Sequence, residues 1–387
     1  MEERLKTFIK THKYWKGLLE SAPYNLSIKE KDDFILFKYN QLYSDMSLPE
    51  VQEARGIIFR KSDWKCVRRA FDKFFNYGEA NAATLDWARG ISVQEKIDGT
   101  LVSAWMDRND LWHLSTNGNI DIKDAPTGDV KYPTFYDIFL EAIHHNADFF
   151  APFQSSMCYT FELVSPVNRV VVPYKNFELY LIGMRDMRTL EEMSANYLDH
   201  EAKILGVKRP KIYEMNSLEE VIEAAQKLPW DEEGYVVCDK NFNRIKVKSP
   251  QYLIAHYSRN NRNISSRTLM RVILENQDEE FLTYCDDYKD DLEELRAARR
   301  SAIRKIHAEM IRLFRVSEGK TRKEFALMTQ NIKGPERNFL FECFELQTMS
   351  EDFDDWARRK NWNEQKWLDF IERWTADEEF YYGMRIT

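Results

Sequence analysis

The sequence predicts an α+β protein whose first part combines helices with mostly antiparallel strands and whose last part is all helical. Ten short runs rich in β-branched and aromatic residues lie between positions 34 and 248, most of them bounded by turn formers. Helical patterns interrupt these runs at only three places, and no strand pattern follows position 250. We therefore expect two domains, residues 1–255 and residues 256–387.

The first domain is expected to begin with an amphipathic helix over residues 2–19, because Leu5, Phe8 and Ile9 recur at helical spacing. The expected strands are residues 34–39, 55–59, 66–69, 91–95, 101–106, 111–115, 159–164, 179–183, 234–238 and 244–248. Helices are expected over residues 136–145, 191–205 and 217–228.

The second domain is expected to consist of helices over residues 269–274, 292–314, 322–329, 339–344 and 363–374. No low-complexity linker separates the two domains, so we expect them to join directly at a helix near residues 252–257.

The composition predicts a folded and acidic protein. The 387 residues are 43% hydrophobic, and 56 Lys and Arg oppose 64 Asp and Glu, which gives a net charge of −8 and excludes indiscriminate binding of polyanions. No apolar run reaches the roughly 18 residues of a membrane-spanning helix, and no signal peptide is visible, so we expect a cytoplasmic protein without a membrane partner. Five dispersed cysteines without a CxxC pair argue against a disulfide framework and a structural zinc site.

A lysine between two predicted strands is the first candidate for chemistry. Lys96-Ile97-Asp98-Gly99 lies between the strand that ends at Glu95 and the strand at residues 101–106. A lysine in such a place can present a primary amine at the floor of a cleft, with the glycine backbone close to a ligand. A polar β-turn would have the same pattern, so the tetrapeptide alone is weak evidence.

Acids and lysines further along the chain strengthen this candidate. Glu162 closes a β-rich run, Glu233-Gly234 opens a strand, and Lys246-Val247-Lys248 ends the next strand. Lys246 and Lys248 point to the same face because side chains alternate along a strand. Near Lys96 they would favour its neutral amine and could hold a phosphate, whereas on a solvated face they would do neither.

In this order, the motifs Lys-x-Asp-Gly, Glu, Glu-Gly and Lys-x-Lys resemble those of the covalent nucleotidyltransferases, the lysine-adenylating ligases and RNA capping enzymes. Gly99-Thr100-Leu101 resembles the Gly-Ser-Leu of RNA ligases. Segments 53–59, 72–76 and 166–171 are similar to the RNA ligases of phage tRNA repair. The similarity covers most of residues 30–257.

The resemblance implies an ATP-dependent RNA ligase with an N-terminal nucleotidyltransferase (adenylation) domain and a helical domain that selects RNA. Lys96 would take AMP from ATP, the AMP would pass to a 5′-phosphate RNA end, and a 3′-hydroxyl would displace it. The catalytic residues would be Lys96, Asp98, Lys246 and Lys248. The nucleotide would be bound by Arg55, Lys73, Phe75, Glu95, Gly99, Glu162, Glu233, Gly234, Lys246 and Lys248, with Glu162 and Glu233 facing Mg²⁺ or Mn²⁺.

The resemblance also implies the partners. The substrate would be RNA with 3′-OH and 5′-phosphate ends, with nicked tRNA as the family's precedent. A separate kinase and phosphatase would heal the ends, because no signature of either is visible here. A capping-type guanylyltransferase and a non-catalytic RNA-end-binding protein remain as alternatives. One position departs from the family pattern, since Asn117 stands where a basic residue is usual.

Two basic segments follow the catalytic motifs. Residues 296–315 contain seven basic residues and one acid, and Arg259, Arg262, Arg267 and Arg271 form a second group. Such groups either contact an RNA backbone or form a plain solvated face.

Overall fold

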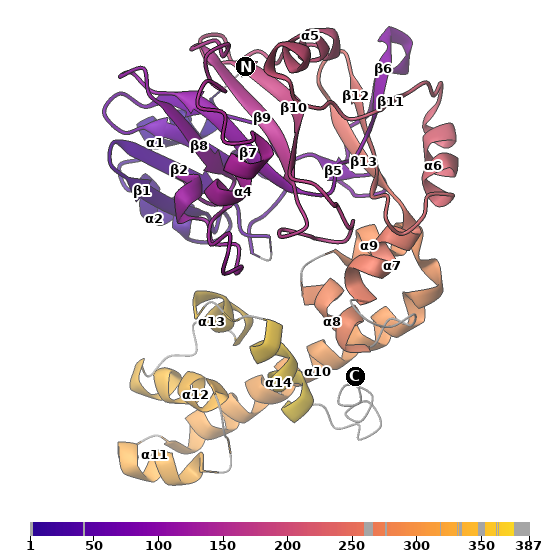
Figure 1. Ribbon diagram of the computed structural model, residues 1–387. Helices are drawn as coiled ribbons and strands as arrows, with labels where there is room; N and C mark the ends of the chain where they lie inside the picture. Colours follow the sequence, from indigo (N-terminus) through magenta and orange to yellow (C-terminus); the bar gives the residue numbers. More distant parts are fainter. Residues whose placement is uncertain are drawn as a thin grey trace. The chain divides into compact units, whose positions relative to one another are not determined.

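The computed structural model describes residues 3–374 except 42, 259–265, 275–276, 318, 331, 333–334, 347–352, 361 and 363. The chain divides into two compact units, Met1–His256 and Tyr257–Thr387 (Figure 1). Every strand among the described residues belongs to the first unit, and the second unit is helical. The predicted α+β class is therefore confirmed.

The first sheet of the first unit carries the N-terminal helices. Its strands pair antiparallel in chain order, β1 (Ser27–Lys31), β2 (Phe34–Lys38), β3 (Arg55–Arg60) and β4 (Lys65–Arg68). Helices α1 (Arg4–Thr11) and α2 (Trp15–Glu20) lie beside it in Figure 1, and α3 (Pro49–Glu53) contacts β3 and α1. Leu5 and Phe8 of α1 join Phe37 and Phe59 of the sheet in one buried core. The single helix expected over residues 2–19 is wrong, because extended backbone at His12 ends α1 there.

Two further sheets complete this unit. The second has the order β10 (Glu178–Asp186), β9 (Met157–Val164), β7 (Thr100–Met106) and β8 (Trp112–Thr116). The third has the order β11 (Ile212–Tyr213), β6 (Ile91–Glu95), β12 (Gly234–Asp239), β13 (Arg244–Lys248) and β5 (Phe75–Asn76). All pairs are antiparallel except β13 with β5.

Helices α4 (Phe135–Ala142) and α5 (Ala195–Leu205) pack on the second sheet, and α6 (Leu218–Gln226) packs on β12 and β13 of the third. Phe139 of α4 and Leu198 of α5 share a core with Phe161 and Leu181 of the strands. Burial of each such side chain contributes about 1.5–3 kcal/mol. This core holds β9, the strand that carries Glu162, in place.

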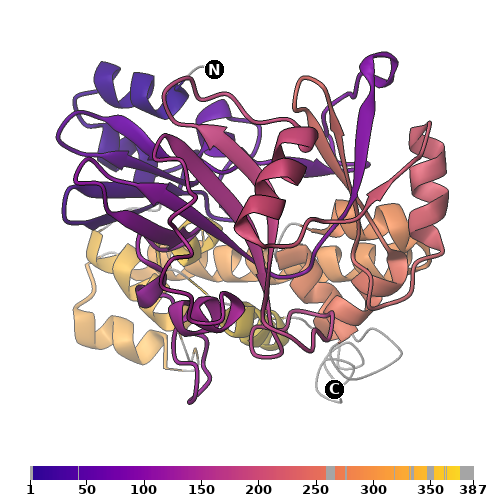
Figure 2. The same cartoon turned by 45° about the horizontal axis from the view of Figure 1, so that its top comes forward.

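The second unit follows α7 (Pro250–Ser258), which crosses the boundary between the units. Its helices are α8 (Ser266–Leu274), α9 (Asp278–Tyr284), α10 (Lys289–Ser317), α11 (Arg322–Met328), α12 (Pro335–Leu346), α13 (Phe353–Arg359) and α14 (Glu364–Trp374). Figure 2 draws them in orange and yellow. Ile306 and Met310 of α10 are buried, as are Trp367 and Phe370 of α14.

Several elements were not predicted from the sequence. They are the strands β1, β5 and β11 and the helices α3, α9 and α13. Strands β5 and β11 have two residues each, too few to show an alternating pattern. Within the part of the chain that the structure describes, no helix has both the length and the apolarity needed to span a membrane.

Candidate functional site

The third sheet places Lys96 beside Lys248, with a glycine between them. Lys96 follows β6 directly, and its backbone N–H donates a 2.8 Å hydrogen bond to the carbonyl oxygen of Gly234. Gly234 in turn lies opposite Lys248 in the pairing of β12 with β13. The three residues therefore form one row across the sheet.

Two more rows continue this arrangement along the strands. They are Gln94–Val236–Lys246 and Ser92–Cys238–Arg244. Alternate residues of a strand share a face, so β13 presents three cations in one column. The β6 side presents the Lys96 amine followed by two neutral polar side chains. The predicted proximity of Lys246 and Lys248 to Lys96 is thus a property of the sheet register.

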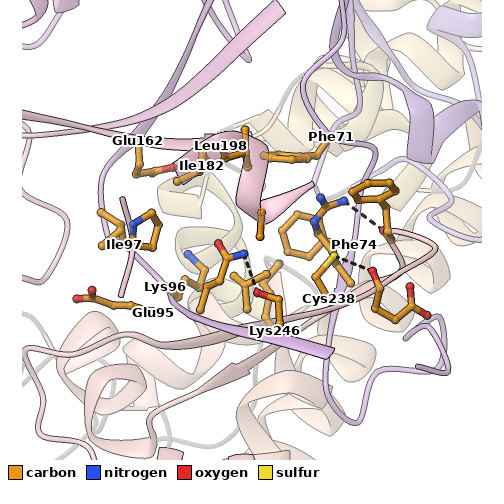
Figure 3. Close-up of a pocket in the computed structure, with 18 of the residues that line it drawn as sticks. Phe71, Phe74, Glu95, Lys96, Ile97, Glu162, Ile182, Leu198, Cys238 and Lys246 are labelled. Atoms are coloured by element: carbon orange, nitrogen blue, oxygen red, sulfur yellow. Dashed lines mark hydrogen bonds between the residues drawn. The ribbon is translucent and has the colours of Figure 1, made fainter. Parts of the chain in front are cut away.

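A cavity of about 330 Å³ lies over these rows (Figure 3). In Figure 3, Glu162, Ile182 and Leu198 lie on one side of the cavity, and Lys96 and Lys246 lie on the other. The charged residues predicted for this site that line the cavity are Arg55, Glu95, Lys96, Glu162, Glu233, Lys246 and Lys248. Motifs spread over nearly 200 positions therefore meet at one place.

The Lys96 amine is held by a buried carboxylate. Its Nζ atom lies 2.7 Å from Oε2 of Glu233, whose side chain is only 5% exposed. The other oxygen, Oε1, lies 3.9 Å from Nζ of Lys248. Glu233 thus stands between the two amines of the first row and orients Lys96 toward the cavity.

Glu162 faces this group from β9 of the second sheet. Burial raises the pKa of its carboxyl group to about 7. The positive charges of Lys96 and Arg55 oppose that rise, while the carboxylates of Glu233 and Asp98 add to it. Among the described residues none hydrogen-bonds to the Glu162 carboxylate, so it is available to a cation or a ligand.

Arg55 and Lys246 flank an aromatic ring at the cavity wall. The guanidinium carbon of Arg55 and the Nζ atom of Lys246 lie 5.0 Å and 5.4 Å from the ring centroid of Phe74. Both distances are typical of cation–π contacts. The Nη1 atom of Arg55 is buried and has no hydrogen-bond partner among the residues described. It can therefore donate to a bound ligand.

A fully buried arginine supports the strand from which Arg55 projects. Arg68 donates hydrogen bonds to the carbonyl oxygens of Arg55 and Gly56, and a 2.9 Å hydrogen bond to Oδ1 of Asn117. Burial lowers the pKa of the Arg68 guanidinium to about 10. Asn117, the position that departs from the family pattern, is thus an acceptor for a neighbouring cation.

Asp98 does not line the cavity. Its side chain is buried, with a relative exposure of 5%. Oδ2 accepts hydrogen bonds of 2.9 Å from the backbone N–H groups of Val171 and Val172, and Oδ1 accepts one of 2.8 Å from Tyr252. The structure thus places this predicted catalytic residue in a hydrogen-bond network that anchors the loop after Lys96.

Lys73 and Phe75 also lie apart from the Lys96 cavity. Both line a neighbouring cavity of about 260 Å³, and Phe74 lines the two cavities. The Lys73 ammonium lies 5.4 Å from the ring centroids of Phe75 and Tyr39. The aromatic residue at the wall of the Lys96 cavity is therefore Phe74, one position from the residue predicted.

Two predicted glycines are explained by contacts within the protein. A Cβ atom at Gly99 would lie 2.6 Å from the carbonyl oxygen of Leu163, and one at Gly234 would lie 2.2 Å from that of Val247. Gly234 also has a φ of +136°. The close packing of the protein's own strands therefore requires glycine at both positions.

The sequence motifs missed Arg244, Gln94 and Phe74 as site residues. Arg244 precedes Lys246 by two positions, and Gln94 precedes Lys96 by two. Alternation along the strands could have found both. Phe74 lies outside any regular strand, so no periodic signal marks it.

The structure also describes the predicted metal ligands and part of the two basic segments. Within the described residues no group of three or more His, Cys, Asp or Glu side chains could hold a metal ion. On α10, Arg296 pairs with Asp278 and Arg312 with Glu309. Arg259 and Arg262 of the second basic group lie outside the described residues, and Arg267 and Arg271 lie on α8.

An amine, two carboxylates and a column of cations around one cavity define a site for a phosphorylated ligand. A model of the RNA ligase family matches residues 53–252, just over half of the chain. The chain therefore belongs to the RNA ligase family, and the resemblance seen in its motifs is confirmed.

Individual relatives are distant. The RNA ligase of Rhodothermus phage RM378 is 27% identical over 369 residues, covering 77% of this chain and 82% of that protein. A protein of Autographa californica nuclear polyhedrosis virus, named for polynucleotide kinase and RNA ligase, is 28% identical over 290 residues. That match covers 69% of this chain but only 40% of the viral protein. An archaeal ATP-dependent RNA ligase structure, 14% identical, superposes with a TM-score of 0.46 over 72% of this chain and 74% of that one.

Proposed function

We propose that the protein is an ATP-dependent RNA ligase that joins a 3′-hydroxyl end to a 5′-phosphate end. The observation that carries this proposal is the Lys96 amine, held 2.7 Å from Glu233 at the head of the three-cation column of β13. The membership of the chain in the RNA ligase family and the name of the phage relative support it.

In the first step Lys96 becomes adenylated. The amine passes a proton to Glu233, the acceptor within hydrogen-bond reach, and attacks the α-phosphorus of ATP. A phosphorus–nitrogen bond forms as the bond from the α-phosphorus to pyrophosphate breaks, which leaves AMP on the lysine. Lys246 and Lys248 face the cavity beside Lys96 and would neutralise the charge that grows on the phosphate oxygens.

Two further steps consume this adenylate. An oxygen of the RNA 5′-phosphate attacks the AMP phosphorus, and Lys96 leaves and regains its proton. The 3′-hydroxyl then attacks the activated 5′-phosphate, so that a phosphodiester forms and AMP and a proton are released. Both steps need the RNA end in line with its leaving group, which makes positioning of the RNA the main demand on the protein.

The carboxylates of the cavity fit a divalent cation. Glu162 has no hydrogen-bond partner among the described residues, and an adjacent cation would offset the cost of its buried charge. One or two carboxylates, completed by phosphate oxygens and water, are the usual ligands of Mg²⁺. Glu162, with Glu233 beside it, would hold Mg²⁺ or Mn²⁺, and the ion would neutralise charge on the triphosphate.

The two units would have different roles in the reaction. Residues 1–255 would form the adenylation domain, since all residues of the cavity lie there. Residues 256–387 would contribute RNA specificity. On α10, Arg300, Arg304 and Arg315 are exposed, and none of them has an acidic partner within the described part of the chain. Exposed arginines of this kind can contact RNA phosphates.

The experiment that tests the function is a sealing assay. A nicked tRNA and a linear single strand, each with a radiolabelled 5′-phosphate, are incubated with ATP and Mg²⁺. Sealing is expected to make the label resistant to phosphatase, with nicked tRNA preferred. A separate kinase is expected to be needed for 5′-hydroxyl ends, as the two-activity name of the viral relative suggests. Binding of RNA without sealing, or labelling of the protein from GTP in place of ATP, would refute the proposal.

A further inference from the structure

Three basic side chains lie at one end of the first sheet, beside the Lys96 cavity. Arg55 begins β3, Lys38 ends β2, and Lys29 lies on β1. Lys38 lies directly opposite Arg55 in the pairing of β2 with β3, so the two side chains share one face of the sheet. Lys29 lies opposite Leu36, two residues before Lys38, and therefore belongs to the same face. We call Arg55, Lys38 and Lys29 the basic track.

The turn that follows β8 shows where the two lysines point. A Cβ atom at Gly118 would lie 3.6 Å from the Nζ atom of Lys38. The Nζ atom of Lys29 donates a 2.8 Å hydrogen bond to Oδ1 of Asn119. The turn itself is held by Oγ1 of Thr116, which accepts hydrogen bonds from the backbone N–H groups of Gly118 and Asn119. Both ammonium groups therefore lie against this one turn.

The basic track carries positive charge that no acid neutralises. Lys38 and Lys29 are exposed, and no member of the track forms an ion pair with an acid among the described residues. Other cations of the sheet do form such pairs. Lys31, the next lysine of β1, pairs with two aspartates at 2.9 Å and 2.6 Å, and Lys61, just after β3, pairs with a glutamate at 3.1 Å. The track is thus a group of uncompensated cations at the end of the sheet that adjoins the cavity.

One end of the track reaches into the Lys96 cavity. Arg55 lines that cavity, and its buried Nη1 atom has no hydrogen-bond partner among the described residues. Lys38 and Lys29 do not line the cavity and follow outside it. Adjacent strands are about 4.8 Å apart, so cations on three neighbouring strands are close enough to contact phosphates of consecutive nucleotides. A nucleic-acid strand with its end in the cavity would meet Arg55 first and the two lysines next.

Position 117 gives Lys38 a particular role. Asn117 stands where a basic residue is usual, and its Oδ1 atom accepts a 2.9 Å hydrogen bond from Arg68. The turn therefore carries no positive charge of its own at this position. Lys38 lies against Gly118, the next residue of the same turn. A lysine of β2 thus places an ammonium group where the hairpin lacks one.

We propose that Arg55, Lys38 and Lys29 bind phosphates of the RNA strand whose end enters the Lys96 cavity, and that Lys38 supplies the positive charge that position 117 lacks. The proposal rests on the proposed ligase function and names the path of the RNA on the first unit. A mononucleotide in the cavity would reach Arg55 but neither lysine, because both lie outside. A longer polyanion can contact all three side chains.

The test measures how RNA binding depends on salt. Binding of a short, fluorescent single-stranded RNA with a 5′-phosphate is followed by anisotropy over a series of KCl concentrations. Lys38→Gln and Lys29→Gln each remove one phosphate contact, so each is expected to lower the slope of log K against log salt by about 0.7 and to weaken binding about fourfold near physiological salt. The control is Lys65→Gln, at an exposed lysine of β4 that lies at the other end of the sheet, opposite Arg60. It should keep the wild-type slope.

An exchange of charge tests the position of the contact. The double variant Lys38→Gln, Asn117→Lys returns an ammonium group to the turn and is expected to restore the wild-type slope. Arg68 keeps its two backbone acceptors in this variant, so the variant is expected to fold. The control Lys38→Gln, Asn109→Lys restores the net charge at the exposed tip between β7 and β8, at the other end of the hairpin, and should not restore the slope.

Three results would count against the proposal. Equal slopes for the three single variants would overturn the basic track. Restoration by both double variants would also overturn it, because net charge alone would then explain binding. Restoration by neither would overturn the exchange between positions 38 and 117.

Failure of the proposed function would be recognised separately, because RNA binding is measured without sealing. A wild type that neither adenylates nor seals, but binds RNA with the expected losses in the variants, would keep the basic track and reject the ligase. A wild type that seals, with variants that bind RNA as it does, would keep the ligase and reject the track.

Discussion

The hydroxyl group of Tyr252 donates a 2.8 Å hydrogen bond to Oδ1 of Asp98, two residues after Lys96. The other carboxylate oxygen accepts hydrogen bonds from the backbone N–H groups of Val171 and Val172. Asp98 therefore ties the loop of the nucleophile to two distant segments of the same unit. Its contribution to the reaction would act through the position of Lys96.

Replacing Asp98 by alanine is expected to lower the free energy of unfolding by about 2–4 kcal/mol, because a buried and a part-buried N–H group and the Tyr252 hydroxyl lose their acceptor. Tyr252→Phe removes one hydrogen bond and is expected to cost about 1 kcal/mol. Urea denaturation measures both values. A loss below about 0.5 kcal/mol for Asp98→Ala would show that the network does not anchor the loop.

Glu162→Gln is expected to stabilise the metal-free protein at high pH while abolishing adenylation. The pKa of Glu162 is raised from 4.5 to about 7, so the folded state binds more protons than the unfolded state between these values. Stability therefore falls as the pH rises through this window, and the full cost of the buried charge is present above about pH 7. The variant removes that cost.

Thermal and urea unfolding in EDTA should show Glu162→Gln more stable than wild type by about 1–3 kcal/mol at pH 8, and no such gain at pH 4. Such a gain in stability with loss of activity is typical of functional residues. A difference in stability between variant and wild type that is the same at both pH values would mean that the Glu162 carboxyl titrates normally.

Gly234→Ala is expected to disrupt the row that aligns Lys96 with Lys248. A Cβ atom would lie 2.2 Å from the carbonyl oxygen of Val247, and the φ of +136° is unfavourable for alanine. We expect at least a hundredfold slower adenylation. The control is Gly206→Ala at the end of α5, where φ is also positive, at +66°, but no atom crowds the position. It should lose about 1 kcal/mol of stability and keep its activity.

Arg68→Lys is expected to destabilise the protein by about 1–3 kcal/mol and to slow adenylation. A single ammonium group cannot reach the carbonyl oxygens of Arg55 and Gly56 together with Asn117. Arg108→Lys, at a side chain that is 61% exposed, should change stability by less than about 0.5 kcal/mol. Urea denaturation and initial rates of adenylation compare the two variants, and equal behaviour would contradict the supporting role of Arg68.

Much of the site could be predicted because it is built on strands. The pair Lys246 and Lys248 follows from the alternation of side chains, and Lys96 was marked by its place between two strands. Arg244 and Gln94 continue the same alternation, so the same pattern also predicts that they face the cavity. The register that sets Lys96, Gly234 and Lys248 in one row depends on pairing between distant strands, which no local pattern specifies.

Other features depend on tertiary contacts. The resemblance to RNA ligases implies a catalytic role for Asp98, and the structure shows that its carboxylate accepts hydrogen bonds from Val171, Val172 and Tyr252. Phe74 and Phe75 are equivalent in sequence, and only the packing around β5 decides which one faces the Lys96 cavity. The end of α1 at His12 was missed because apolar residues continue at helical spacing beyond it.

The most direct test of the central claim is covalent labelling of Lys96. Purified protein is incubated with α-³²P-ATP and Mg²⁺, denatured in SDS and separated by electrophoresis, with Lys96→Ala run beside it. The Lys96–Glu233 arrangement predicts one labelled band for the wild type and none for the variant. An unlabelled wild type, or a variant that labels equally, would contradict the assignment of Lys96 as the nucleophile.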